Sequence, residues 1–305
     1  MILIADSGST KTDWTLINSN HPGHWDVVAT FHTQGINPVH QSPDVIRHII
    51  GHELMSQLST FPRSSLVHSR VLESPLLSQL DIFFYGSGCT PAHTPRMKQM
   101  LSEVFTHQRI EVHSDLMAAA RALCGYQPGV ACILGTGSNS CLYDGTGIVA
   151  NTPALGYILG DEGSGSVLGR QFLNALYKGR LPEQLKTAFE QETKLTQATV
   201  IQKVYREPLA NRFLASLSLF ISKHTDEPLL RNLVIDNFRE FLRNNVEPYR
   251  KHSIYSDDGM SVNFVGSMAE HYESELREAA QSEGFTVGKV MKSPMEGLVA
   301  YHCEV

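Results

Sequence analysis

Two short segments rich in glycine and hydroxyl side chains are the first candidates for chemistry in this sequence. The first reads D-S-G-S-T-K and follows an apolar run at residues 2–5. Gly8 lets backbone amides approach a ligand closely, and Lys11 adds a positive charge beside them. Ser9 and Thr10 add hydroxyl groups. The segment could therefore bind phosphate, although an ordinary polar hairpin turn would have the same composition.

Asp6 precedes this turn, at the end of the apolar run. A carboxylate there could hold Mg²⁺ directly or through water, because Mg²⁺ prefers hard oxygen ligands and keeps several waters. The segment is not a Walker A loop, since that motif requires glycine immediately before its lysine, whereas Thr10 precedes Lys11 here.

The second segment, at residues 135–139, reads G-T-G-S-N and follows an apolar run at residues 130–134. It repeats the chemistry of the first segment, with flexible glycines, hydroxyl side chains and an amide. Two such turns from two half-domains could face each other across a cleft, where each would hold part of a triphosphate chain.

Glycines flank the paired acids Asp161 and Glu162 in the segment 156–165, just before a predicted helix. Paired acids there could hydrogen-bond sugar hydroxyls or act in acid–base catalysis. Alternatively, one of them caps the helix that starts near Ser164. Since a cap needs one residue and no glycines on either side of two acids, we favour ligand binding.

Asp115 follows an apolar run at residues 110–113 and opens a predicted helix at residues 115–123. An acid in the first turn of a helix has a plain capping role. The carboxyl end of a strand is also where open α/β sheets bind ligands, and a carboxylate there could accept a proton from an attacking hydroxyl. From the local sequence alone, the cap is the favoured interpretation.

A further strand-to-helix turn reads V-G-S-M-A at residues 265–269. Its glycine and serine could pack against the base and ribose of a nucleotide. A tight turn with a serine cap explains the same residues equally well.

The composition excludes several classes of protein. The chain has 305 residues, 42% of them hydrophobic, which excludes a disordered chain. Its 25 Lys and Arg against 31 Asp and Glu argue against a general nucleic-acid binder. No apolar run is long enough for a membrane span, and the N-terminus lacks the basic region of a signal peptide. Five scattered cysteines form neither a disulfide framework nor a zinc pattern, so we expect a reduced, cytoplasmic protein.

Short apolar runs bounded by glycine, aspartate or asparagine predict the strands of an α/β protein. They lie at residues 2–5, 14–17, 27–31, 82–85, 110–113, 130–134, 141–143, 147–150 and 262–265. Apolar residues at helical spacing predict helices. These lie at residues 44–58, 95–105, 115–123, 167–177 and 267–280. The stretch 182–249 has almost no strand signal and predicts consecutive helices with breaks near Pro208, Pro228 and Pro248.

A coarse internal repeat divides the chain. In each half a strand leads into a Gly/Ser/Thr turn that is followed by two more strands. This pattern suggests a duplicated domain with a boundary near residue 116, although Gly-rich strand ends are common in any α/β protein.

The order of these segments resembles the sugar-kinase/Hsp70/actin superfamily and, within it, the N-acetylglucosamine-kinase-like branch of the BadF/BadG/BcrA/BcrD ATPase family. The most specific part of the resemblance is the pair G-T-G-S-N and G-D-E-G-S-G, and the resemblance spans essentially the whole chain. It implies two RNase H-like domains with an interdomain cleft and a helical insertion in the second domain. The domains would comprise residues 1–115 with 293–305, and residues 116–292, with a C-terminal helix at 295–302 returning to the first domain.

The resemblance also implies a role for each candidate residue. Asp115 matches the catalytic base, and Asp6 would organise Mg²⁺. The residues that would bind ATP are Gly8, Ser9, Thr10, Lys11, Thr136, Gly137, Gly266, Ser267 and Ala269. Those that would bind the sugar are Asn37, Ser138, Asn139, Gly156 and Asp161. Tyr157 stands where kinases of this branch often have tryptophan.

The implied function is phosphorylation of an amino sugar by ATP, with N-acetylglucosamine and its 6-hydroxyl favoured. One alternative is an ATPase activator of a 2-hydroxyacyl-CoA dehydratase, which would need cysteine ligands for an iron–sulfur cluster, and the segment 156–165 has none. Another is a sugar or muropeptide sensor without catalysis. The expected partners are a small sugar and, because relatives are often dimers, a second copy of the chain in a homodimer. We expect no binding to nucleic acid or to a membrane.

Overall fold

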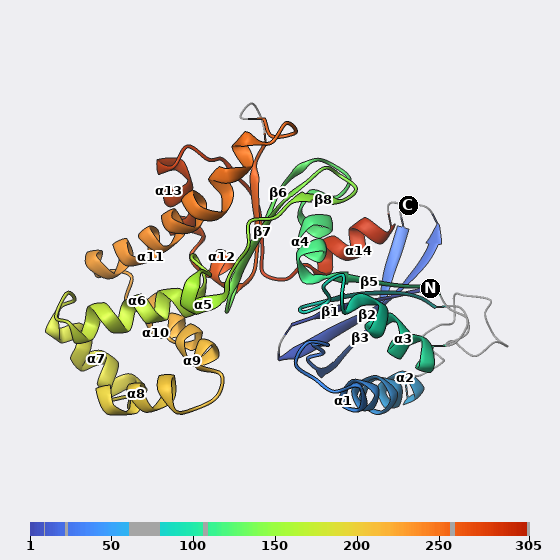
Figure 1. Ribbon diagram of the computed structural model, residues 1–305, viewed down its shortest axis with the longest axis horizontal. Coiled ribbons are helices and arrows are strands. Elements are labelled where there is room, and N and C mark those ends of the chain that lie inside the picture. The colour runs from blue at the N-terminus through green and yellow to red at the C-terminus, as the bar shows by residue number, and fades with distance from the viewer. Residues whose placement is uncertain (9, 22–23, 61–79, 106–108, 257–259, 304–305) are drawn as a thin grey trace. The chain divides into compact units, whose positions relative to one another are not determined.

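The computed structural model describes residues 1–8, 10–21, 24–60, 80–105, 109–256 and 260–303 (Figure 1). The chain forms two compact units. Unit 1 comprises Met1–Gly125 and Pro294–Val305, and unit 2 comprises Tyr126–Ser293. We expected the first division after residue 115. The helix that begins there packs against the C-terminal helix and the sheet of unit 1, so the structure divides the chain after that helix.

Each unit is built on one five-stranded sheet. In unit 1 the order is β3-β2-β1-β4-β5, and in unit 2 it is β8-β7-β6-β9-β10. The first three strands of each unit pair antiparallel, while the fourth and fifth extend the sheet in parallel with the first. The bounds are β1 (Ile2–Ser7), β2 (Lys11–His21), β3 (His24–Gln34), β4 (Asp81–Gly86), β5 (Ile110–Ser114), β6 (Gly129–Leu134), β7 (Ser138–Tyr143), β8 (Ile148–Ala150), β9 (Val262–Val265) and β10 (Val287–Met291). The matching topology confirms the repeat expected from the two Gly/Ser/Thr turns.

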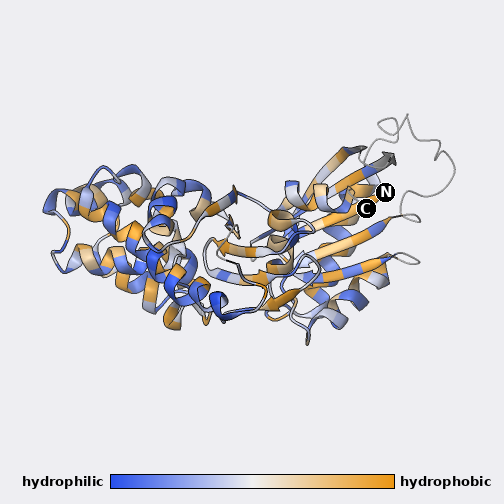
Figure 2. Ribbon diagram, turned by 90° about the horizontal axis from the view of Figure 1, so that it is seen from above, coloured by the Kyte–Doolittle hydropathy of each residue, from blue (hydrophilic) through white to orange (hydrophobic). Residues whose placement is uncertain are grey.

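Strand β1 shows how the alternation of side chains positions unit 1. Leu3 and Ala5 belong to a core on one face of the sheet, together with residues of the helices that follow β3 and β4. Ile4 belongs to a second core on the other face, with residues of the helix after β5 and of the C-terminal helix. Since neighbouring side chains of a strand point to opposite faces, Asp6 lies on the same face as Ile4. Figure 2 shows how strongly the strands of unit 1 are apolar.

Helices cover both faces of the sheet in unit 1 and make up most of unit 2. In unit 1 these are α1 (Pro43–His48), the π-helical turn Ile49–Leu54, α2 (Met55–Thr60), α3 (Thr94–Val104), α4 (Asp115–Cys124) and α14 (Met295–Cys303). In unit 2 they are α5 (Gly156–Leu159), α6 (Gly165–Tyr177), α7 (Glu183–Thr193), α8 (Gln197–Tyr205), α9 (Ala210–Ser216), α10 (Ser218–Lys223), α11 (Pro228–Phe241), the turns Leu242–Val246 and Glu247–Lys251, α12 (Ser267–His271) and α13 (Glu273–Ser282). The helices α7 to α11 form the expected insertion between β8 and β9.

Most sequence-based elements are confirmed. Pro208 lies between α8 and α9, Pro228 begins α11, and Pro248 lies in the short helix after it. The predicted helix 267–280 breaks at Tyr272 into α12 and α13. Strand β10 was not predicted, because a glycine and a lysine interrupt its apolar residues and it lies half-buried at a sheet edge. Among the described helices none has the length and apolar character needed to cross a membrane.

Candidate active site

Polar residues of unit 1 gather at the carboxyl ends of the three parallel strands β1, β4 and β5. Asp6 is the penultimate residue of β1, a Gly-Ser-Gly segment begins at the last residue of β4 and continues into the turn after it, and Asp115 follows β5 directly. Asp6 pairs in register with Asp13 of β2. This edge of a parallel sheet is where α/β proteins bind ligands, so the fold brings together residues that are far apart in the sequence.

The first Gly/Ser/Thr turn connects β1 to β2. Its Gly8 amide donates to the Lys11 carbonyl at 3.0 Å. The buried Ser7 hydroxyl lies 2.7 Å from that of Thr12 and accepts a hydrogen bond from the Ile36 amide at 2.9 Å. These bonds fasten the turn to the loop after β3. Gly8, Thr10 and Lys11 are exposed, as a phosphate-binding turn requires, while Ser9 lies outside the described residues.

Burial and neighbouring charges perturb the Asp6 carboxyl on this edge. Burial raises the pKa of its carboxyl to about 7, with further increases from the negative charges of Asp13 and Asp115 and an opposing effect from Lys11. The ammonium of Lys11 is 2.7 Å from the Asp13 carboxylate. The edge therefore holds more negative than positive charge, which favours binding of a cation.

Asp115 does not have the capping role that its local sequence favours. The N-cap of α4 is Ser114, whose hydroxyl accepts from the Met117 amide at 3.2 Å. The Asp115 carboxylate accepts from the adjacent Leu116 amide at 2.8 Å and from its own backbone amide. Burial raises the pKa of the Asp115 carboxyl above its ordinary value, although these two amides oppose the effect. The cap alternative is wrong, because the preceding serine already performs that role.

Asn37 lies beside the turn that follows β4. Gly88 in this turn has a φ of +80°, and a Cβ placed on it would come within 2.3 Å of the Asn37 side-chain oxygen. Burial raises the pKa of the Cys89 thiol to about 12, and the negative charge of Asp115 contributes to this increase. The turn is therefore close to both Asn37 and Asp115. We did not predict the roles of Gly88 and Asp13. The Gly-Ser-Gly at residues 86–88 follows an apolar run, as do the two glycine-rich segments that the sequence singled out.

In unit 2 the second Gly/Ser/Thr turn connects β6 to β7. The Gly135 carbonyl accepts from the Gly165 amide at 2.8 Å, and the Thr136 carbonyl accepts from the Ser166 amide at 3.2 Å. The turn is thus held by the first turn of α6. The glycine-rich segment 156–165 and the turn 135–139 are separate in the sequence, but these hydrogen bonds join them into one structure.

Asp161 connects these segments through its side chain. Its carboxylate accepts hydrogen bonds from the amides of Ser138 and Gly156. A Cβ placed on Gly137 would lie 3.0 Å from it. Burial raises its pKa to about 6, despite these hydrogen bonds, and the charge of Glu162 adds to the effect. Asp161 also has a φ of +57°, which is unfavourable for a residue with a side chain.

Neither acid of this segment caps α6. Ser164 is the N-cap and accepts from the Val167 amide at 3.2 Å. Glu162 instead accepts from the side-chain amides of Asn244 and Asn245, at 3.0 and 3.3 Å. The capping alternative for the two acids is therefore wrong, and Asp161 is held at the β6–β7 turn.

The remaining candidates of unit 2 differ in their availability. Ser138 has a buried hydroxyl with no hydrogen-bond partner among the described residues. Asn139 uses its side-chain oxygen to accept from Ser140 and Asn151. Ala269 is fully buried in the core of unit 2.

Gly266 forms the turn between β9 and α12. Its φ is +126°, and a Cβ there would come within 2.2 Å of the Leu134 carbonyl oxygen. Glycine is therefore required, and the close approach brings this turn against the end of β6. Ser267, which follows, is exposed.

Comparisons with known proteins support this fold. A scan against models of protein families finds no match, and a search of curated proteins finds none either. Among solved structures, the chain is similar to a candidate N-acetylglucosamine kinase from Porphyromonas gingivalis, with 45% identity, 99% of both chains covered and a TM-score of 0.87.

Two more distant structures share the fold. One is a candidate N-acetylglucosamine kinase from Chromobacterium violaceum, at 18% identity, with 100% of this chain and 98% of that one covered and a TM-score of 0.68. The other is a ROK family glucokinase from Streptomyces griseus in complex with glucose and AMPPNP, at 15% identity, with 98% and 97% covered and a TM-score of 0.52. The expected fold of two RNase H-like α/β domains is thereby confirmed. With 45% identity over essentially its whole length to the Porphyromonas protein, the chain belongs to the BadF/BadG-type sugar kinases, in their N-acetylglucosamine-kinase-like branch.

Proposed function

We propose that this sugar kinase transfers the γ-phosphoryl group of ATP to the 6-hydroxyl of N-acetylglucosamine. The choice of sugar is supported by the name of the Porphyromonas relative at 45% identity. The observation that carries the chemical proposal is the position of Asp115, a half-buried carboxylate at the carboxyl end of β5. Because Ser114 caps α4, the Asp115 carboxylate is not needed as the cap.

Asp115 acts as the general base in this proposal. It accepts the proton of the sugar hydroxyl while the hydroxyl oxygen forms a bond to the γ-phosphorus and the bond to the β-phosphate oxygen breaks, releasing ADP. Its raised pKa makes it a stronger base than an exposed aspartate. The deprotonated form is still needed, so turnover should fall in acid.

The other candidate residues of unit 1 bind the two substrates and hold them in position. The exposed turn at Gly8, Thr10 and Lys11 binds phosphate oxygens, with Ser9 assigned there from the sequence alone. Asn37, held beside Gly88, contacts the sugar. Phosphoryl transfer depends mainly on positioning and electrostatic stabilisation, so these contacts carry much of the catalysis.

Unit 2 supplies a second phosphate turn and further sugar contacts. Thr136 and Gly137 bind phosphate, while Ser138, Gly156 and Asp161 bind the sugar. The buried hydroxyl of Ser138 has no hydrogen-bond partner within the described part of the chain. This supports the assignment, because leaving a buried hydroxyl unpaired is costly unless a ligand forms the missing hydrogen bond. Gly266, Ser267 and Ala269 are proposed for the adenosine and Asn139 for the sugar; backbone groups are the available contacts at Ala269.

Asp6 fits the role of holding Mg²⁺ on the nucleotide. Among the described residues no group of three or more His, Cys, Asp or Glu side chains is arranged to bind a metal. Mg²⁺ bound to nucleotides typically takes one or two carboxylates, with water and phosphate oxygens as its other ligands. The excess negative charge around Asp6 favours such an ion. When bound, Mg²⁺ would neutralise negative charge on the phosphates.

The test is ADP release by the purified protein with Mg·ATP across a panel of hexoses and amino sugars. We expect N-acetylglucosamine to stimulate release and Asp115→Asn to lower kcat about 100-fold to 10,000-fold while ATP still binds. Asp44→Asn is the matched control, because Asp44 also lies in the first turn of a serine-capped helix but its side chain is 92% exposed. Near-normal turnover of Asp115→Asn would refute the role of Asp115 as the base. Preference for another sugar would refute N-acetylglucosamine as the substrate.

A further inference from the structure

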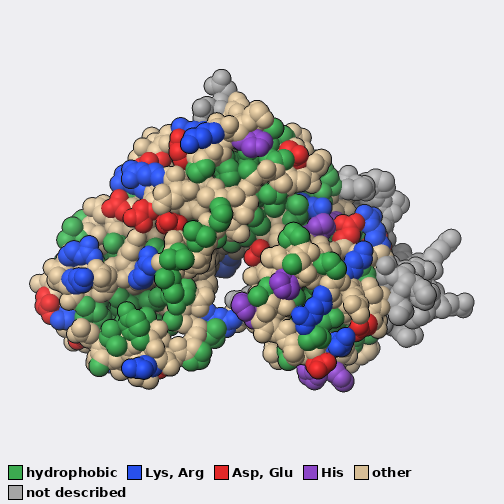
Figure 3. Space-filling model, in the orientation of Figure 1, with side chains coloured by type: hydrophobic (Ala, Val, Ile, Leu, Met, Phe, Trp, Pro, Cys, Tyr) green, Lys and Arg blue, Asp and Glu red, His purple; other side chains and the backbone are tan. Residues whose placement is uncertain are grey.

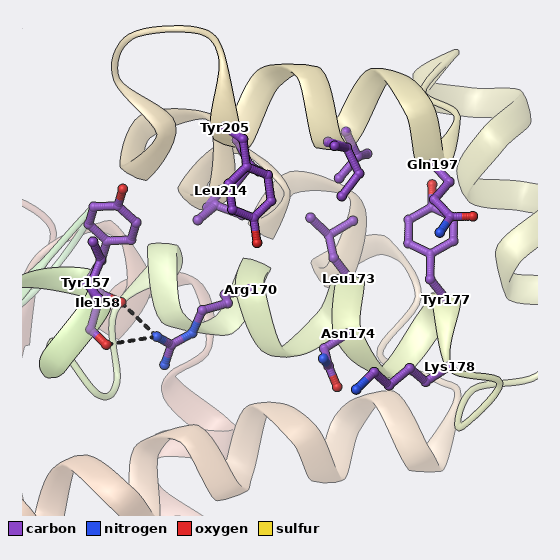
Figure 4. A pocket seen from close by; sticks show the side chains of 13 residues that line it. Tyr157, Ile158, Arg170, Leu173, Asn174, Tyr177, Lys178, Gln197, Tyr205 and Leu214 are labelled. Carbon is purple, nitrogen blue, oxygen red and sulfur yellow. Dashed lines mark hydrogen bonds between the residues drawn. The ribbon is translucent and has the colours of Figure 1, made fainter.

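A cavity of about 570 Å³ lies within unit 2 between α5, α6, α8 and α9. None of the residues proposed above for ATP or sugar lines it. Its walls are largely apolar and include three tyrosines, Tyr157, Tyr177 and Tyr205 (Figure 4). Cavities of this size with apolar and aromatic walls and a few polar groups are typical of small-molecule sites.

Large apolar side chains at this cavity are open to water. Ile158 of α5 is 69% exposed, Ile201 of α8 is 50% exposed and Tyr205 is 73% exposed. Single exposed apolar residues are ordinary, but a contiguous group marks an interaction site. Figure 3 shows hydrophobic side chains gathered over this part of unit 2, with Lys and Arg side chains around them.

Two cations line the same cavity, one on α6 and one at the residue that follows it. Arg170 and Lys178 are eight residues apart, which places them about 12 Å apart along the helix. No aspartate or glutamate lines the cavity, and neither cation forms an ion pair with a carboxylate in the part of the chain that the structure describes. An apolar cavity with two cations and no acid is complementary to a ligand with an apolar body and negative charge.

We propose that this cavity binds a small organic anion with an aromatic body. The tyrosine rings provide faces against which a ring system stacks. The ammonium of Lys178 and the guanidinium of Arg170 provide charge-assisted hydrogen bonds to a carboxylate, sulfonate or phosphate group.

Arg170 connects the cavity to the segment that carries Asp161. Its guanidinium donates to the carbonyls of Tyr157 and Ile158, at 2.9 and 3.2 Å, and so holds α5 (Figure 4). Asp161 follows α5 and accepts from the Gly156 amide at its start. An anion that draws Arg170 away from these carbonyls would loosen α5 and raise the KM for the sugar. This coupling rests on the proposed function, whereas the binding site does not.

Two fluorescent probes separate the anionic charge from the apolar body. One is 8-anilinonaphthalene-1-sulfonate, and the other is N-phenyl-1-naphthylamine, which has the same rings without the sulfonate. We expect saturable binding of the sulfonate to the protein without sugar or nucleotide, about tenfold tighter than binding of the neutral probe. Equal affinity for the two probes, or no saturable binding, would overturn the proposal.

Variants with matched controls locate the site. Lys178→Gln should weaken the sulfonate about fivefold and leave the neutral probe unchanged, whereas Lys194→Gln, at the end of the next helix α7, should change neither. Ile201→Asp should weaken both probes, and Leu229→Asp, on a side chain exposed to 52%, should weaken neither. Circular dichroism and thermal midpoints check that each variant folds.

The same variants distinguish the other occupants of the cavity. A concentration-dependent dimer in sedimentation velocity that Ile201→Asp abolishes would overturn the proposal in favour of a second copy on this face. If both control variants weaken the probes as much as the cavity variants do, the dyes bind elsewhere and the proposal fails. In the kinase assay, a sulfonate that binds without raising the sugar KM would refute the coupling through Arg170.

Discussion

Asp6→Asn should stabilise the protein, and more strongly as the pH rises. In the folded chain, burial and the carboxylates of Asp13 and Asp115 raise the pKa of Asp6 from 3.8 to about 7. The folded state therefore holds this proton more tightly than the unfolded state does. Wherever the folded state binds more protons, the free energy of unfolding falls as the pH rises. The fall spans the window from about pH 4 to pH 7 and is complete above it.

The size of the effect follows from the two pKa values. With 3.8 in the unfolded chain and about 7 in the folded one, ionisation of Asp6 costs about 2 kcal/mol of stability at pH 5 and about 4 kcal/mol at pH 8. Asparagine has no such ionisation. The stability difference between Asp6→Asn and the wild type should therefore grow by between about 2 and 3 kcal/mol from pH 5 to pH 8.

Urea unfolding at the two pH values measures this difference. Asp44→Asn is the control, since its exposed carboxylate should give a difference that does not change over this range. At pH 8, Mg·ADP should stabilise the wild type more than Asp6→Asn, because a bound cation relieves the repulsion. A stability difference that is the same at pH 5 and pH 8 would refute the electrostatic reasoning.

Three further predictions test other parts of unit 1. Gly88→Ala should raise the sugar KM with little change in the affinity for ATP, because its Cβ would displace the Asn37 side chain; Gly51→Ala, where a Cβ meets nothing within 4 Å, is the control for the kinetic assay. Ser114→Ala should lower the free energy of unfolding by about 1 kcal/mol and lower kcat, with both measured on the same preparation; unchanged stability would contradict the cap. Burial lowers the pKa of His302 to about 3, so between about pH 6.5 and pH 3 only the unfolded state binds a proton at this residue. In urea titrations, the free energy of unfolding of the wild type should therefore fall by about 2 kcal/mol relative to His302→Gln between pH 7 and pH 5.

Local patterns in the sequence were sufficient to predict most elements. The nine predicted strands all coincide with strands of the structure, because each is a short apolar run between turn residues. Strand β10 was missed because its partners, rather than its composition, make it a strand. The repeat of turn and strand order was also readable, and the sheet topology confirms it.

The contacts within the candidate site needed the fold. The adjacent residues Ser114 and Asp115 can each cap a helix, and only the backbone geometry shows that the serine does so. Likewise, nothing in the sequence near Asn37 indicates that Gly88 lies against its side chain.

The sequence by itself determined the fold class, the duplication and the segments that carry the candidate residues, because these depend on local composition and order. The tertiary structure alone decided which of those residues share one environment. Burial gives Asp6 and Asp161 their raised pKa values, and the negative charge of Asp115, which is remote in the chain, raises the pKa of Asp6 further. The cavity beside α6 also depends on the fold, since side chains of α5, α6, α8 and α9 come together to form its walls.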